Sequence, residues 1–103
     1  MKHVILVSHG TFAPGLHNAL NMLAGAKKEE LKSTSLHDGM GIDIFENNFT
    51  DLIKDITEKD KIVLLADIIG GSPMTAALNI LTEKGFIKNT AAFGGMNLSM
   101  GLT

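Results

Sequence analysis

Residues 61–73, with the sequence KIVLLADIIGGSP, restrict the fold of this chain more than any other stretch. Five apolar residues in succession, the first two of them β-branched, predict a strand buried on both faces, as in a parallel sheet. A glycine pair follows, and then Ser72 and Pro73, which favour a helix start with Ser72 as its cap. The stretch therefore predicts a strand, a tight turn and a helix, with Asp67 at the carboxyl end of the strand.

The rest of the chain repeats this alternation. Short strands are predicted at residues 4–7, at residues 33–36, where the polar sequence favours a sheet edge, and within residues 86–93, starting near Asn89. Helices are predicted where apolar residues recur at helical spacing. The three apolar stripes are Leu16, Ala19, Leu20 and Leu23; Phe45, Phe49, Leu52, Ile53 and Ile56, in a helix from Ile42 onward; and Met74, Ala77, Leu78 and Leu81.

The order β-α-β-α-β-α-β predicts an α/β fold in a single domain, residues 1–103. Right-handed crossovers favour an open, mainly parallel, doubly wound sheet of strand order 2-1-3-4, a flavodoxin-like three-layer sandwich. In that order the first and third strands are neighbours, and their helices leave to opposite faces. The crevice at their carboxyl ends is predicted to bring His9 and Asp67 together, although they are far apart in sequence.

An imidazole beside a carboxylate in such a crevice has a clear chemical use. The carboxylate accepts a hydrogen bond from one ring nitrogen, fixes the tautomer and leaves the other nitrogen as a nucleophile. Nearby glycines allow backbone N–H groups to approach a ligand, and the start of the following helix favours an anion. Together these features predict a histidine that accepts a phosphoryl group while nearby donors hold the phosphoryl oxygens. His9 and Asp67 are therefore the predicted catalytic pair. The predicted phosphoryl-binding residues are Gly10, Gly70, Gly71 and Ser72.

Composition excludes several other classes of protein. The net charge of -2 and the 5% aromatic content argue against nucleic-acid binding. With no cysteine, the chain has no disulfide and no thiolate metal site, which fits a cytoplasmic protein. No Walker-type motif and no evident metal or nucleotide site occur, so no cofactor is expected. The phosphoryl group is therefore expected to come from another protein rather than from ATP.

A surface that exchanges phosphate with other proteins must surround His9. Thr11 and Phe12 follow the first strand, and Met96 and Asn97 follow the last, so these four residues and the loop after Asp67 are the predicted docking rim. For Phe12, core packing is an equally good alternative. Of the other histidines, only His37 lies in a turn at the same sheet edge, as a rim candidate.

At these residues the chain resembles the mannose-type enzyme IIA components of the bacterial sugar phosphotransferase system (PTS). The resemblance is carried by ILVSHG at residues 5–10 and DIIGGSP at residues 67–73, supported by GGMN at residues 94–97. It extends over nearly all 103 residues. It implies that His9 is phosphorylated, that Asp67 pairs with it, and that residues 70–72 help to bind the phosphoryl group.

The resemblance also implies partners. The donor would be the phosphocarrier protein HPr, the acceptor a IIB component that phosphorylates incoming sugar, and the membrane IIC and IID components would be indirect partners. Members are typically homodimers, with a further C-terminal helix and an edge strand that this chain is expected to lack. The sequence does not identify the sugar.

Two alternatives come from other functional classes. A His-Gly at the end of a first strand also resembles small tetrapyrrole metal chelatases, which need further His or Glu ligands; only His37 is suitably placed. The second alternative is a flavodoxin-like signalling or ligand-binding domain. A phosphate-receiving domain of that kind would need an acidic cluster at the end of the first strand, where this chain has His9.

Overall fold

The computed structural model describes residues 2–24 and 31–97. The order of elements is β1 (Lys2–His9), α1 (Phe12–Ala24), β2 (Leu31–Leu36), α2 (Ile42–Leu52), β3 (Lys61–Ala66), α3 (Ser72–Glu83), a short 3-10 turn (Ile87–Asn89) and β4 (Thr90–Phe93). The predicted alternation is confirmed for these residues. The expectation that the chain lacks a further C-terminal helix concerns residues after Asn97, which lie outside the described residues.

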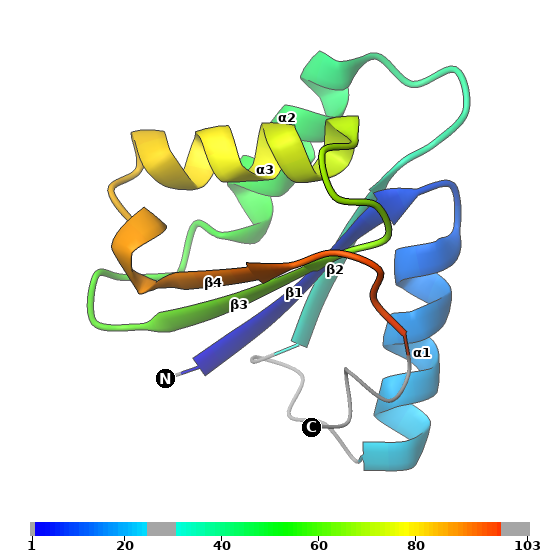
Figure 1. Cartoon of the computed structure of the whole chain (residues 1–103), viewed down its shortest axis with the longest axis horizontal. Helices are drawn as coiled ribbons and strands as arrows, with labels where there is room; N and C mark the ends of the chain where they lie inside the picture. Colours follow the sequence, from blue (N-terminus) through cyan, green and yellow to red (C-terminus); the bar gives the residue numbers. More distant parts are fainter. Residues whose placement is uncertain (1, 25–30, 98–103) are drawn as a thin grey trace.

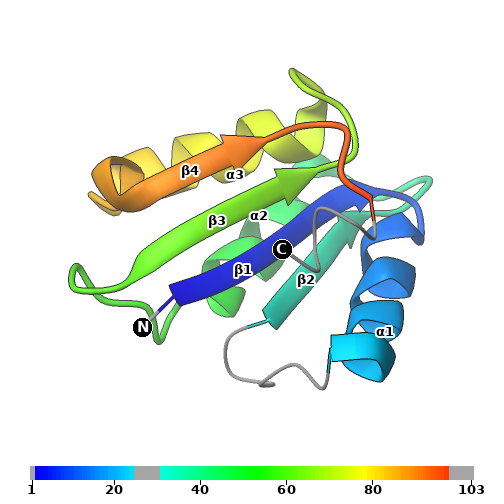
Figure 2. The same ribbon diagram turned by 60° about the horizontal axis from the view of Figure 1, so that its bottom comes forward.

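The four described strands form one parallel sheet in the order β2-β1-β3-β4, which confirms the predicted topology. All strands point the same way, so their carboxyl ends share one edge (Figure 2). His9 pairs in register with Leu36 of β2, while Val7 pairs with Ala66 of β3. The residues after the central strands β1 and β3 are therefore adjacent at this edge.

The helices enclose the sheet in three layers (Figure 1). α2 and α3 cover one face, where Phe45, Phe49 and Leu81 are fully buried against β1 and β3. α1 packs on the other face, where Leu16 and Leu20 meet Leu6 and Leu65. Since β1 and β3 contribute to both clusters, they form the rigid centre from which the carboxyl-edge loops extend.

The sequence patterns predicted which helices and strands form, but they predicted the first and last residues of these elements less well. β2 begins at Leu31, two residues earlier than expected. α2 ends at Leu52, so Ile53 and Ile56 are buried in the turn that follows and not in the helix. In α1 the predicted stripe is wrong at Leu23, which is 62% exposed, whereas Ala13 is buried. The buried face of α1 therefore begins at Ala13, one turn earlier than the sequence suggested. Near the end of the helix, the Leu23 side chain is exposed to solvent.

The start of α3 also differs from the prediction. Gly71 is the N-cap and no side chain caps the helix, so Ser72 is the first helical residue rather than its cap. Pro73 lies in the first turn, as expected from its missing N–H, and its side chain is buried. The hydroxyl of Ser72 is consequently not used as a helix cap.

Candidate functional site

His9 is the last residue of β1, and Asp67 immediately follows β3. Nδ1 of His9 lies 3.0 Å from Oδ2 of Asp67, and the backbone N–H of His9 donates to the same oxygen at 3.0 Å. Oδ1 of Asp67 accepts the backbone N–H of Ile68 at 2.9 Å. The strand order therefore produces the predicted juxtaposition, and the carboxylate is oriented from both of its oxygens.

These contacts determine the charge on Asp67. Partial burial raises the pKa of its carboxyl, but the hydrogen bonds from the backbone and ring of His9 lower that pKa by more. The net pKa of Asp67 lies below its usual value, so the group is an anion at neutral pH. The side chain is only 17% exposed, whereas that of His9 is 45% exposed. The carboxylate is thus sheltered, and the imidazole can be reached by another molecule.

The contact with Asp67 also determines the tautomer of His9. An ionised carboxylate only accepts hydrogen bonds, so Nδ1 carries the proton and Nε2 of the neutral ring holds a free lone pair. The Cε1 edge of the ring faces Gly71, where an added Cβ would lie 3.1 Å from Cε1. A residue larger than glycine would push the ring, so Gly71 sets the position of the nucleophilic edge.

The loop between Asp67 and α3 brings backbone donors to the ring. It is a tight turn in which the N–H of Gly71 approaches the carbonyl of Ile68 at 3.4 Å and Gly70 has a φ of 78°. Only glycine adopts this φ without strain. The N–H of Thr75 makes the first intrahelical bond, to Gly71, which leaves the N–H groups of Ser72 and Met74 without an intrahelical acceptor. This helix start, next to His9, can accept an anion.

Gly10 lies at the same edge, but its backbone is used differently. Its N–H donates to the carbonyl of Leu36 at 2.9 Å, which extends the pairing of β1 with β2. Of the four predicted phosphoryl-binding residues, Gly71 approaches the His9 ring, and Gly70 and Ser72 are its neighbours in the turn and at the start of α3. Gly10 has committed its N–H to β2, so it is not a free backbone donor in this arrangement.

Ser8 has a role that the sequence analysis missed. Its side chain is fully buried, and its hydroxyl accepts the backbone N–H of Ala13 at 2.7 Å. The bond satisfies one of the open N–H groups at the start of α1 and holds that helix close to His9. A serine just before a strand-end histidine and four residues before the start of a helix is the signal that could have indicated this contact.

The described rim around His9 is partly as predicted. Thr11 and Asn97 are exposed, and Phe12 is 47% exposed, so Phe12 is not a core residue. Ile68 and Ile69, in the loop after Asp67, are 56% and 75% exposed. Three large apolar side chains therefore border the site on the surface.

The prediction that Met96 belongs to the exposed rim is wrong. Its side chain is only 4% exposed and packs with Ala13, Leu16 and Leu20. The reason is that the chain after β4 continues along β3: the N–H of Gly95 donates to the backbone carbonyl of Asp67, and that of Met96 to the carbonyl of Ala66. This pairing turns Met96 under the loop, toward α1.

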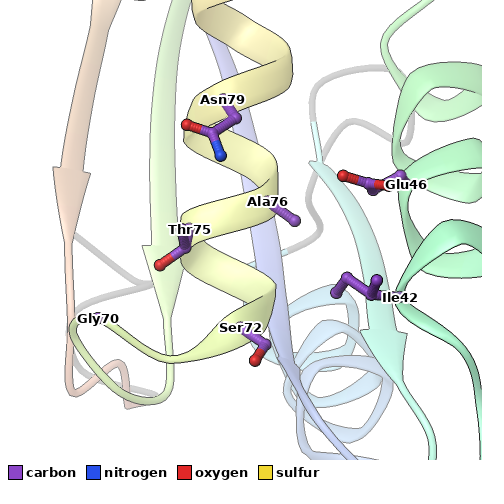
Figure 3. Close-up of a pocket in the computed structure, with 7 residues that line it drawn as sticks. All are labelled: Ile42, Glu46, Gly70, Ser72, Thr75, Ala76 and Asn79. Atoms are coloured by element: carbon purple, nitrogen blue, oxygen red, sulfur yellow. The ribbon is translucent and has the colours of Figure 1, made fainter.

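An open pocket of about 380 Å³ adjoins the α3 side of the site (Figure 3). Gly70 and Ser72 line it at the start of α3, and Ile42 and Glu46 face them from α2. Since Ser72 borders both this pocket and the loop beside His9, a partner that reaches His9 from this side would meet the Glu46 carboxylate.

Of the remaining histidines, His3 and His17 lie away from the His9–Asp67 pair, whereas His37 lies near it. His3 is buried at the opposite edge of the sheet, with Nε2 3.3 Å from Asp60. His17 of α1 bonds the hydroxyl of Ser33 at 2.7 Å, and burial lowers its pKa. His37 is exposed, 3.4 Å from the hydroxyl of Ser35 and at the same edge as His9.

Among residues 2–24 and 31–97, no three side chains of His, Cys, Asp or Glu gather as a metal site would require. None of the described helices has the length and apolar character needed to cross a membrane.

Comparison with known proteins identifies relatives over the whole of this arrangement. The profile of the EIIA-man family, described as "PTS system fructose IIA component", matches residues 3–101. The PTS system fructose-specific EIIA component of Bacillus subtilis (strain 168) is 31% identical over 83 residues. That match covers 81% of this chain but 56% of the relative, so the chain spans little more than half the length of that protein.

Solved structures give the same family of folds. Phosphotransferase system component EIIA from Streptococcus agalactiae superposes with a TM-score of 0.80 at 27% identity, covering 97% of this chain and 73% of that one. The mannose/sorbose specific IIA subunit from Enterococcus faecalis reaches the same TM-score at 23% identity, covering 99% and 74%. At 23% identity, the similarity to the second structure supports only the fold.

Proposed function

This chain belongs to the EIIA-man family of sugar phosphotransferase system IIA components, and from that premise we propose that it carries a phosphoryl group on Nε2 of His9. The family predicted from the sequence motifs is confirmed. The residue, the partners and the chemical step are our proposals. The observation that carries them is the 3.0 Å contact of His9 Nδ1 with Asp67, which directs Nε2 outward as a nucleophile.

The proposed step is a direct transfer between two imidazoles. Nε2 of His9 attacks the phosphorus of the phosphohistidine on HPr, a new N–P bond forms, and the donor's N–P bond breaks with its electron pair returning to the donor ring. Positive charge develops on the His9 ring as the bond forms, and the Asp67 anion stabilises it through Nδ1–H. Such transfers depend mainly on positioning and charge stabilisation.

The loop and the helix start supply the anion-binding part of the proposed site. The N–H of Ser72, together with its exposed hydroxyl and the positive end of the α3 dipole, would hold phosphoryl oxygens beside His9. Gly71 is needed for space and Gly70 for the turn. We assign no cofactor to this step, because both reacting groups belong to proteins.

We further propose that HPr donates to this site and that a IIB component accepts from it, feeding the membrane IIC and IID components. Both proteins must reach the same nitrogen, so they bind in turn. The exposed apolar residues Phe12, Ile68 and Ile69, with polar Thr11 and Asn97, form the proposed docking rim. A homodimer remains part of the proposal and is checked by light scattering.

The experiment is incubation with phosphoenolpyruvate, enzyme I and HPr, followed by intact mass and peptide mapping. The wild type should gain one phosphoryl group on His9, stable in base and labile in acid. His9→Ala should gain none and keep its circular dichroism spectrum, because the side chain is exposed. A phosphate mapped to another histidine, or an adduct lost in base, would overturn the proposal; the latter would favour a receiver-type acyl phosphate.

A further inference from the structure

A second open pocket, of about 370 Å³, lies on the β2 side of His9, away from the loop before α3. Two imidazoles, those of His9 and His37, line this one cavity. Its lining residues are His9, Gly10, Leu36, His37, Asp38, Gly39 and Met40. The titratable groups in this lining are His9, His37 and Asp38; Asp67 lies behind His9, and Asp43 is in the first turn of α2.

His37 is held in place by the backbone on both sides. The preceding residue, Leu36, pairs in register with His9 and accepts the N–H of Gly10 at 2.9 Å. The carbonyl of His37 accepts the N–H of Met40 at 2.9 Å, which closes a turn. The ring itself approaches the buried Ser35 hydroxyl through Nε2, at 3.4 Å. His37 is thus fixed next to His9, with Nδ1 as its second polar atom.

A phosphoryl group on Nε2 of His9 has three oxygens to satisfy. The helix start at Ser72 serves one side of the ring. On the other side the pocket contains the Asp38 carboxylate, which repels an anion, so a donor is needed there. An imidazole provides an N–H in both of its protonation states, and a charged one when protonated.

Resting on the function proposed above, we propose that His37 is a second phosphoryl-binding residue. Its ring donates a hydrogen bond to an oxygen of the phosphoryl group on His9 and favours the phosphorylated state. No bond is made to or broken at His37.

The test is the equilibrium constant for phosphoryl exchange with HPr, measured by intact mass after mixing phospho-HPr with each variant until the ratios stop changing. A docking defect alters rates but leaves this equilibrium constant unchanged, whereas loss of a phosphoryl contact shifts it. His37→Ala should lower the constant roughly ten- to a hundredfold, the effect of one hydrogen bond to a charged group. His37→Gln, which keeps an uncharged donor, should lie between His37→Ala and wild type.

Asp38→Asn is the matched control, since it removes the carboxylate from the same pocket. It should leave the constant unchanged or shift it toward the phosphorylated protein.

An unchanged equilibrium constant in His37→Ala, with His9 phosphorylated normally, would overturn this inference and leave the proposed function intact. Failure of the wild type to gain phosphate on His9 would remove both. Phosphate found on His37 itself would also overturn the binding role.

Discussion

His9 and Asp67 lie 58 positions apart in the chain, yet one oxygen of Asp67 accepts both the backbone N–H and the ring Nδ1 of His9. The backbone bond fixes where β1 ends relative to β3, and the ring bond fixes the tautomer. One carboxylate therefore determines both the place and the protonation of the proposed nucleophile.

Asp67→Asn should slow phosphoryl transfer from HPr by roughly 10²-fold or more, with the fold retained. An amide hydrogen-bonds the ring but does not fix the same tautomer, and it offers no charge to offset the developing imidazolium. Rapid-quench kinetics with phospho-HPr measure the effect. Transfer at a near-normal rate would show that the Asp67 charge is not needed.

The depressed pKa of Asp67 predicts how stability depends on pH. Because its folded-state pKa lies below the ordinary value of 3.8, the carboxylate stabilises the fold above about pH 4, and this contribution is lost as the pH falls through the folded-state pKa. Urea unfolding of wild type and Asp67→Asn at pH 7 and pH 3 should give free energies of unfolding that converge in acid. A difference that stays constant with pH would assign the effect to packing.

Gly71→Ala should reduce the transfer rate about tenfold, because the added Cβ meets Cε1 of His9 at 3.1 Å and displaces the ring from its transfer position. The backbone of Gly71, with φ of -71°, accepts alanine, so the free energy of unfolding should change by no more than about 1 kcal/mol.

Gly15→Ala, in the first turns of α1, is the matched control for Gly71→Ala. Its added Cβ meets nothing within 4 Å, so transfer should be normal, and the helix should gain about 1 kcal/mol of stability. Equal rates in the two variants would contradict the close approach of Gly71 to the ring.

Ile69→Asp should raise the KM for phospho-HPr about tenfold while changing kcat and the circular dichroism spectrum little, since Ile69 is 75% exposed on the proposed rim. Met22→Asp is a control of equal exposure, 77%, near the far end of α1. If both substitutions act alike, the effect comes from net charge and not from the rim. By contrast, Met96→Asp should unfold the protein, because Met96 is buried.

Much of the fold and the proposed site was accessible from the sequence. The apolar run before Asp67 and the stripes through Phe45, Phe49 and Leu81 carry their own periodicity, and the alternation of elements with right-handed crossovers leaves few strand orders. The approach of His9 to Asp67 follows from that order alone, since His9 ends β1 and Asp67 directly follows the neighbouring parallel strand β3. These features depend on the spacing of apolar residues and on the order of strands and helices, and both can be read from the sequence.

The remaining features depend on which element covers which, and that is decided only in three dimensions. Met96 looked like a surface residue of a loop, but pairing of its backbone with Ala66 carries it under that loop into contact with α1. Leu23 continued the apolar stripe of its helix in the sequence, yet in the structure it is 62% exposed. Burial depends on the sum of all neighbours around a side chain, and for residues in irregular loops no periodicity in the sequence records those neighbours.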